Sequence, residues 1–216
     1  SCSIIAIFLM LRVQLPSAHV PELYEEIRIH NAKIENRLAD WLNRARMHAD
    51  HMIISDHPKL VKLREQMALL DFTDEVKALE QLNRFINNDV TYIDDYHHFH
   101  KSDYWADPET TLLEGGDCED IALLKAAVLQ RFGWPAERKH LLVGLLTERG
   151  NQESHAVLLV ETSTGDQLIL RSITDEVVHP SDYEFIPIYA VDQHGTLIVK
   201  SRDPQHLLHS QNTAAE

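Results

Sequence analysis

The chain has 216 residues, of which 44% are hydrophobic and 25% are charged, which is an ordinary composition for a globular protein. It is long enough to bury a core as one domain of moderate size. The formal net charge of −14 argues against a general nucleic-acid-binding protein, because neutralising phosphates requires clustered Lys and Arg. We therefore expect no nucleic-acid partner. The acidic balance fits a soluble protein that attracts cations such as calcium.

An apolar run at residues 4–11 stands near the start of the chain. It is too short to span a bilayer, which needs about 20 residues. Because Pro, Ser and Ala follow at 16–18, residues 1–18 look like the apolar core and cleavage region of a secretory signal peptide. We expect an exported mature chain without stable membrane insertion. No basic residue precedes the run and the chain starts at Ser1, so a truncated signal and a buried N-terminal segment are both open.

The expected signal peptide determines how many cysteines the mature chain would keep. Removal of residues 1–18 would remove Cys2 and leave Cys118 as the single cysteine of the mature chain. A single cysteine cannot form an internal disulfide. A lone thiol in an exported protein indicates that its reactivity is used, whereas the alternative is a small buried hydrophobic residue.

Helices are expected over the first part of the chain. Apolar residues recur at steps of three, four and seven over residues 22–50, with charges elsewhere, and this pattern predicts an amphipathic helix. A second helix is expected over 58–70 and a third over 74–87. Their apolar stripes indicate packing and carry no chemistry.

Residues 89–116 are predicted to form a loop, because they are rich in turn formers and aromatic residues. His97, His98 and His100 lie in this loop and suggest a metal site. Zinc ligands usually come from separate elements, however, so we interpret these histidines as surface residues.

The next helix is predicted over residues 118–132, and the Gly-x-Pro sequence at 133–135 ends it. Asp117 is a suitable N-cap, and Asp120 stands at the third helical position, where a carboxylate can bond back to the cap. Cys118 falls in the first turn, where free N–H groups and the helix dipole favour a thiolate. The neighbouring carboxylates repel an anion. They favour a nucleophile only if a cation, such as a protonated histidine or a bound calcium, neutralises them.

Beyond this helix the apolar pattern becomes typical of strands, expected over 140–148, 155–162, 166–173, 184–191 and 196–201. The turn sequences STGD and DQHG predict two hairpins. Helices followed by strands imply an α+β fold with a mainly antiparallel sheet. The domain would span residues 19–202, with a loose polar tail over 203–216.

A reactive thiol also needs a base, usually a histidine brought from elsewhere in the fold. His155 is the best placed, because it begins the otherwise apolar strand SHAVLLV, which would hold it rigid. Taken alone, a histidine at a strand end is more often a partly exposed residue. Together with Cys118 at a helix start, in a chain of helices and then strands, it favours a catalytic pair. This is the order found in papain-like and transglutaminase-like folds.

Several segments of the sequence together resemble a known protein family. DYWADPE (103–109), GDCED (116–120) and the later HAVLLV, LIL and PIYAV resemble the bacterial transglutaminase-like cysteine proteases, over roughly residues 72–192. The resemblance implies a papain/transglutaminase-like core with helices at its N-terminal side. It implies Cys118 as the nucleophile and His155 as the general base.

The resemblance also implies a calcium site formed by Asp117 and Glu119, with Asp120 as a weaker candidate. Carboxylate oxygens are hard ligands that suit a divalent cation, which would remove the repulsion beside the thiol. Without the resemblance, capping and solvation would explain these acids. Trp105 and the Pro-Glu pair at 108–109 also match the motif and are expected to shape the loop.

One position departs from the family pattern. The family usually has Asp-Asn after the LIL strand, the Asp being the third triad member, whereas this chain has Arg171 and Ser172. A carboxylate orients the imidazole and stabilises its charged form, and an arginine does neither. Asp175 lies about 13 Å further along an extended strand, and Asp166 is further away, so neither substitutes without a bend. Three interpretations stay open: a slow Cys–His dyad, another group orienting His155, or binding without cleavage.

The leading interpretation is a periplasmic, calcium-dependent cysteine endopeptidase. By resemblance, its substrate would be the N-terminal region of a large cell-surface adhesin, so that cleavage controls biofilm attachment. Its regulator would be an inner-membrane cyclic-di-GMP receptor. The alternative is a catalytically weak or inactive binding module of the same fold, which Arg171 favours. Acyl transfer to an amine ranks last, because nothing in the sequence excludes water.

Overall fold

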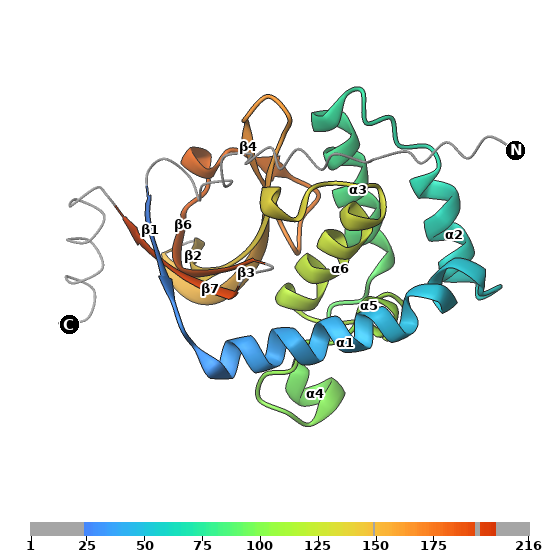
Figure 1. Ribbon diagram of the computed structural model, residues 1–216, viewed down its shortest axis with the longest axis horizontal. Coiled ribbons are helices and arrows are strands. Elements are labelled where there is room, and N and C mark those ends of the chain that lie inside the picture. The colour runs from blue at the N-terminus through green and yellow to red at the C-terminus, as the bar shows by residue number, and fades with distance from the viewer. Residues whose placement is uncertain (1–23, 149, 193–194, 202–216) are drawn as a thin grey trace, which may run out of the picture.

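The computed structural model describes residues 24–148, 150–192 and 195–201. Helices gather on one side of the molecule, and a strongly curved sheet lies on the other (Figure 1). The expected signal peptide at 1–18 and the expected tail at 203–216 lie outside the described residues. Within the described ranges, no helix has both the length and the apolar character needed to cross a membrane.

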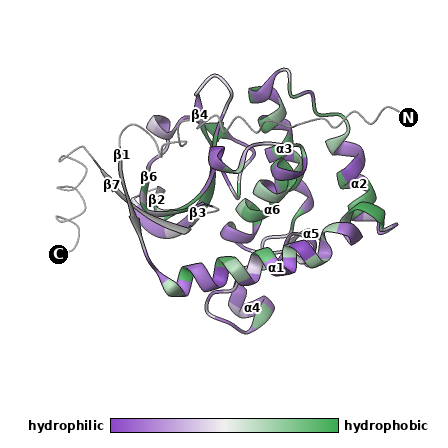
Figure 2. Ribbon diagram, viewed as in Figure 1, coloured by the Kyte–Doolittle hydropathy of each residue, from purple (hydrophilic) through white to green (hydrophobic). Residues whose placement is uncertain are grey.

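Helices alternate with short connections through the first half of the described chain. They are α1 (Ala32–Ile54), α2 (Pro58–Met67), α3 (Glu75–Asp89), α4 (Asp95–Phe99), α5 (Pro108–Glu114) and α6 (Cys118–Arg131). Hydrophilic and hydrophobic residues alternate along α1, as expected of a helix with one buried face (Figure 2).

The strands form a single seven-stranded antiparallel sheet in the order β1-β7-β6-β2-β3-β4-β5. They are β1 (Tyr24–Ile29), β2 (Lys139–Glu148), β3 (Asn151–Glu161), β4 (Gln167–Leu170), β5 (Val177–Val178), β6 (Phe185–Asp192) and β7 (Gly195–Ser201). The predicted α+β class with a mainly antiparallel sheet is confirmed. The two-residue β5 was not predicted, because two valines give no alternating pattern.

The helix predicted over residues 22–50 is wrong at its start. Residues 24–29 form β1, which pairs along its whole length with residues 196–201 of β7. The local sequence does not reveal this pairing, because the partner strand lies about 170 residues away in the chain. Asn31 then caps α1 by accepting a hydrogen bond from the backbone N–H of Ile34.

The loop predicted over residues 89–116 contains two short helices, α4 and α5. Each follows an N-cap aspartate, Asp94 and Asp107, whose side chain accepts backbone N–H groups of the first turn. Pro108 at the first helical position suits α5. Helices of five and seven residues are too short to show an apolar period, so the loop prediction missed them.

Helix α6 lies at the centre of the fold. It packs against β3, with α3 and α5 beside it. Alternate residues of β3 face opposite sides of the sheet: Ala156, Leu158 and Val160 join the main core with the helices, whereas Val157 and Leu159 join a second cluster on the other face. The sheet therefore holds residues 156–160 of β3 against α6.

Candidate active site

The predicted start of α6 is confirmed. The helix begins at Cys118 with Asp117 as its N-cap. The fully buried Asp120 accepts hydrogen bonds from two backbone N–H groups: Asp117 at 3.3 Å, and Ala106 at 2.7 Å in the loop before α5. One carboxylate thus fixes both the helix start and the neighbouring loop. A Cβ on Gly116 would lie 2.6 Å from Asp120 Oδ2, so this close approach requires glycine.

The DYWADPE segment shapes that loop, as the sequence analysis expected. The Trp41 Nε1 of α1 donates to the carbonyl oxygen of Ala106 at 2.8 Å. Trp105 is buried under the guanidinium of Arg37, which also pairs with Asp103 at 2.5 Å. The loop is therefore held between α1 and the first turn of α6.

Cys118 is a free, buried thiol, and 9% of the residue is exposed. It donates to Glu119 Oε2 at 3.2 Å, while the backbone N–H of Ala156 in β3 donates toward the sulfur. Burial is the largest cause that raises the pKa of this thiol, followed by the charges of Glu119 and Asp117; the Ala156 contact opposes the rise. Burial and these carboxylates therefore favour the protonated thiol.

His155 directly precedes Ala156, so its backbone stands beside the position that contacts the sulfur. The histidine is 6% exposed and lies opposite Gly144 of β2. Burial lowers the pKa of His155 to about 4, and the positive charge of Arg171 acts in the same direction. The ring is therefore neutral at pH 7 and can accept a proton.

Arg171 lies just after β4, among acidic and aromatic side chains. Its guanidinium pairs with Glu148 at 2.7 Å and with Glu176, and it stands 4.9 Å from the centre of the Tyr183 ring. The neighbouring Ser172 donates through its hydroxyl to the Ala156 carbonyl oxygen at 2.8 Å. The position of the expected triad acid thus carries an ion-paired cation near His155.

The three predicted metal ligands, Asp117, Glu119 and Asp120, lie together, and the structure adds Asp95 and Asp103 to them. Ligand atoms lie within 4.8 Å of one another in three overlapping groups: Asp117, Cys118 and Glu119; Asp95, Asp117 and Asp120; and Asp95, Asp103 and Glu119. Asp95 and Asp103 were not predicted to lie in this cluster. Asp103 stands in the DYWADPE motif, which was a usable signal, whereas Asp95 stands in the segment taken as a loop.

This acidic cluster has the donor chemistry of a calcium site. Within the described residues, Asp117 Oδ1 and Asp95 Oδ1 are buried oxygens without a hydrogen-bond partner. Burial and neighbouring carboxylates raise the pKa of Asp117 to about 10 and that of Asp95 to about 6. Hard oxygen ligands with unmet bonding capacity suit Ca²⁺. Both carboxylate oxygens of Asp120 already accept hydrogen bonds from backbone N–H groups, which agrees with its position as the weaker candidate for a calcium ligand.

The histidines at 97, 98 and 100 belong to no such group within the described part of the chain. His97 pairs with Asp94 at 2.6 Å, and His98 lies 3.4 Å from Glu114. His97 and His100 are exposed and His98 is half-buried, which agrees with their interpretation as surface residues.

The comparison with solved structures agrees with the fold. Among solved structures, calcium-bound LapG of Legionella pneumophila has a TM-score of 0.59 and 24% identity over 74% of this chain and 90% of that chain. EGTA-treated LapG of the same organism has a TM-score of 0.48 and 25% identity over 81% and 82%. No curated protein matches the chain.

A family model adds the decisive comparison. The model of bacterial transglutaminase-like cysteine proteinases matches residues 57–202, which include α6, β3 and the acidic cluster. The match extends over more than half of the chain. The chain therefore belongs to the bacterial transglutaminase-like cysteine proteinases.

Proposed function

We propose that this cysteine protease is a calcium-dependent endopeptidase of the periplasm. Its substrate is the N-terminal region of a large cell-surface adhesin, and its cleavage controls biofilm attachment. One observation carries the proposal: the thiol of Cys118 stands at a helix start, against the backbone beside His155, within carboxylates whose buried oxygens lack partners.

Asp117 and Glu119 would hold the calcium ion, with Asp95 and Asp103 as further oxygen donors. A bound calcium ion would neutralise the carboxylates that surround the thiol. Asp120 keeps the helix start and the Ala106 loop in place beside them. The LapG of Legionella pneumophila has a calcium-bound structure, which supports the choice of ion.

The chain's own residues carry the chemistry. His155 takes the thiol proton, and the sulfur of Cys118 attacks the carbonyl carbon of the scissile peptide. The backbone N–H of Cys118, free at the helix start, donates to the oxyanion. His155 then protonates the leaving amine, which leaves a thioester. Water, deprotonated by His155, attacks that thioester, releases the carboxylic acid and restores the thiol.

Because Arg171 stands where the third member of the triad is expected, we propose that Cys118 and His155 act as a dyad. The paired strands β2 and β3 and the contact of Ser172 with Ala156 replace the triad acid in holding the histidine backbone. They do not stabilise the charged imidazole as a carboxylate would, so we expect slow turnover.

The second candidate function is a catalytically weak or inactive binding module. The observation that favours it is the guanidinium of Arg171 near His155, because a cation opposes protonation of the ring. Such a module would bind the adhesin segment through the same surface and leave it intact.

The decisive experiment incubates the purified protein with an adhesin N-terminal fragment, in calcium or in EGTA, beside Cys118→Ala. We expect cleavage in calcium and none in EGTA or with the variant. Equal binding by both proteins without cleavage would favour the binding module.

Arg171→Asp tests the dyad mechanism, with Arg84→Asp on the exposed side of α3 as the matched control. We expect Arg171→Asp to raise kcat and the control to leave it unchanged. An unchanged kcat in both variants would contradict the role given to position 171.

The proposed regulator is an inner-membrane cyclic-di-GMP receptor that sequesters the protease. Its periplasmic part should inhibit cleavage in the same assay when added in equimolar amounts. Undiminished cleavage with the receptor in excess would remove this partner from the proposal.

A further inference from the structure

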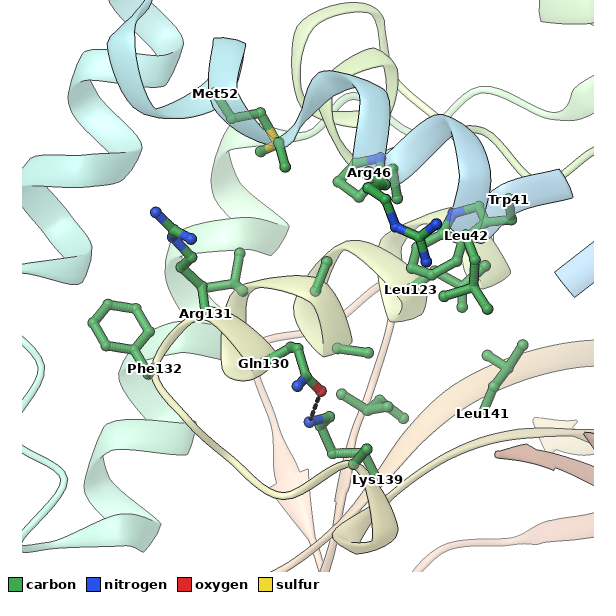
Figure 3. A pocket seen from close by; sticks show the side chains of 18 of the residues that line it. Trp41, Leu42, Arg46, Met52, Leu123, Gln130, Arg131, Phe132, Lys139 and Leu141 are labelled. Carbon is green, nitrogen blue, oxygen red and sulfur yellow. Dashed lines mark hydrogen bonds between the residues drawn. The ribbon is translucent and has the colours of Figure 1, made fainter. Parts of the chain in front are cut away.

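A large cavity lies away from the proposed catalytic pair. It has a volume of about 970 Å³ and is lined mainly by α1, α2, α6 and the start of β2, with further residues from β3 and β6. On α6 its lining begins at Leu123, beyond the first turn that carries Cys118. Figure 3 shows side chains from these separate elements around the hollow. Its volume is at the upper end of the range for small-molecule sites.

The wall of the cavity is mainly apolar, and its mouth is apolar as well. Buried side chains such as Trp41 and Leu141 form part of the wall. Three large hydrophobic side chains stay partly exposed along its edge: Leu42 at 40%, Ile53 at 37% and Phe132 at 42%. Exposed apolar area grouped around a hollow indicates a ligand with an apolar body.

The charges around the cavity have the opposite sign to the chain as a whole. Four cationic side chains and one carboxylate line it: Arg46, Arg64, Arg131 and Lys139, with Asp192. This excess of cations occurs in a chain with a net charge of −14. The cavity therefore favours a ligand that carries a negative charge.

Two of these cations already have their partners. Lys139 donates to Gln130 Oε1 at 2.9 Å, drawn in Figure 3, and to the carbonyl oxygens of Trp134 and Pro135. Arg64 donates to the carbonyl oxygens at the end of α1. Within the described residues, the guanidinium groups of Arg46 and Arg131 form no hydrogen bond or ion pair, so they remain available.

The two available arginines lie at opposite ends of the hollow. In Figure 3, Arg131 is drawn on the same side of the hollow as Met52 and Phe132, and Arg46 on the same side as Trp41 and Leu42. Arg64 belongs to the first end, because its Nη1 donates to the Met52 carbonyl oxygen at 2.9 Å. The end at Arg131 thus holds two positive charges, one of them free.

We propose that this cavity binds an unbranched long-chain carboxylate. Its carboxylate pairs with Arg131, because a free guanidinium offers a planar fork of donors to a carboxylate. Its hydrocarbon chain lies along α6 toward Trp41 and Leu42, where it removes apolar surface from water. This site is independent of the proposed endopeptidase chemistry and takes a different class of ligand.

Calorimetric titration with octanoate, decanoate and dodecanoate tests the apolar wall. EDTA is included because calcium precipitates long-chain carboxylates. The affinity should rise about fourfold for each methylene added to the chain, as expected for burial of each group. An affinity that does not depend on chain length would overturn the proposal. Binding to anionic lipid vesicles without binding to free dodecanoate would overturn it as well.

Neutral variants test the position of the carboxylate. Arg131→Gln should weaken dodecanoate binding by about fivefold, as expected for loss of one partly exposed ion pair. Arg46→Gln, at the other end of the cavity, should weaken binding less than Arg131→Gln does, and Arg84→Gln, on α3 outside the cavity, should bind as the original protein does. Weakening by Arg46→Gln alone would contradict the assigned orientation.

A cavity-filling variant tests the site itself. Ala127→Phe adds a ring to the wall and should abolish dodecanoate binding, whereas Ala39→Phe on the exposed part of α1 should preserve it. Thermal unfolding of both variants identifies a failure to fold. If Ala127→Phe does not fold, the weaker dodecanoate binding expected of the surface variant Arg131→Gln still tests the proposal. A concentration-dependent dimer that Ala127→Phe dissociates would overturn the proposal, because a second copy would then cover the cavity.

Discussion

At the scale of single residues, Arg171 has the strongest influence on the proposed base. Burial is the largest cause that lowers the pKa of His155, and the positive charge of the Arg171 guanidinium is the next largest. The guanidinium also holds Glu148 and Glu176 in ion pairs. Replacing it therefore changes the charge around the histidine in two ways.

We expect Arg171→Gln to raise the pKa of His155 from about 4 toward its usual value of 6.5. Removal of a cation favours the charged imidazolium, and release of Glu148 adds a negative charge near the ring, so both effects have the same sign. Titration of the His155 ring protons by NMR measures this change. Arg84→Gln is the control, and an equal pKa in all three proteins would show that Arg171 does not act on the ring.

At the scale of elements, the first turn of α6 depends on one close contact. A Cβ at position 116 would lie 2.6 Å from Asp120 Oδ2 and 2.7 Å from its Cβ. Gly116→Ala should therefore displace the carboxylate from the N–H groups of Ala106 and Asp117. We expect a loss of about 1–3 kcal/mol in the free energy of unfolding.

Urea denaturation measures this loss for Gly116→Ala. Gly133→Asn is the matched control, because a Cβ there meets nothing within 4 Å and asparagine tolerates its φ of +80°. Equal losses in the two variants would contradict a specific role for the contact between Gly116 and Asp120.

The turn between β4 and β5 is held by polar side chains of α3 and α6. Lys125 and Asn87 both donate to the carbonyl oxygen of Arg171, at 2.8 Å and 3.1 Å. Asn83 donates to the carbonyl oxygens of Thr174 and Glu176. Helices α3 and α6 thus fix the segment that carries Arg171.

Burial gives Lys125 a pKa well below its usual value of 10.5. Between the folded and the unfolded pKa, the unfolded chain binds more protons, so stability rises with pH and is lost as pH falls. We expect the free energy of unfolding, relative to that of Lys125→Met, to rise as pH increases toward 10.5, by up to about 1.4 kcal/mol per pH unit. Denaturation at several pH values measures it, and a flat difference would contradict a neutral buried amine.

At the scale of the whole molecule, the elements with strong local signals were predictable. Asp117 and Asp120 follow capping rules that act within four residues, so the start of α6 and its capping contact were read correctly. The pairing of β1 with β7 was not, because it joins the two ends of the described chain. Local patterns contain no information about such a distant partner.

The candidate site likewise has a part that the local sequence predicts and a part that depends on tertiary structure. Cys118, Asp117 and Glu119 are neighbours in sequence, and their motif indicated a cation. Asp95 enters the cluster only because the segment before α4 runs beside Gly116, where Ile93 donates its backbone N–H to the Gly116 carbonyl oxygen at 3.1 Å. Tyr104 also donates its backbone N–H to Asp95 Oδ2. The acids that complete the cluster are therefore set by tertiary structure.

The effect of calcium on the whole molecule follows from this cluster. Buried carboxylates without a cation repel one another, and an ion that binds only the folded state stabilises it by about 2.7 kcal/mol at a hundred times its Kd. For a chain of this length that raises Tm by roughly 5–10 °C. Scanning calorimetry in calcium and in EGTA measures the difference. Asp95→Asn should reduce this rise in Tm, because the stabilisation comes from ligands in this cluster. Asp50 is an exposed acid of α1 outside the cluster, so Asp50→Asn should leave the rise unchanged. An equal rise in all three proteins would place the calcium elsewhere.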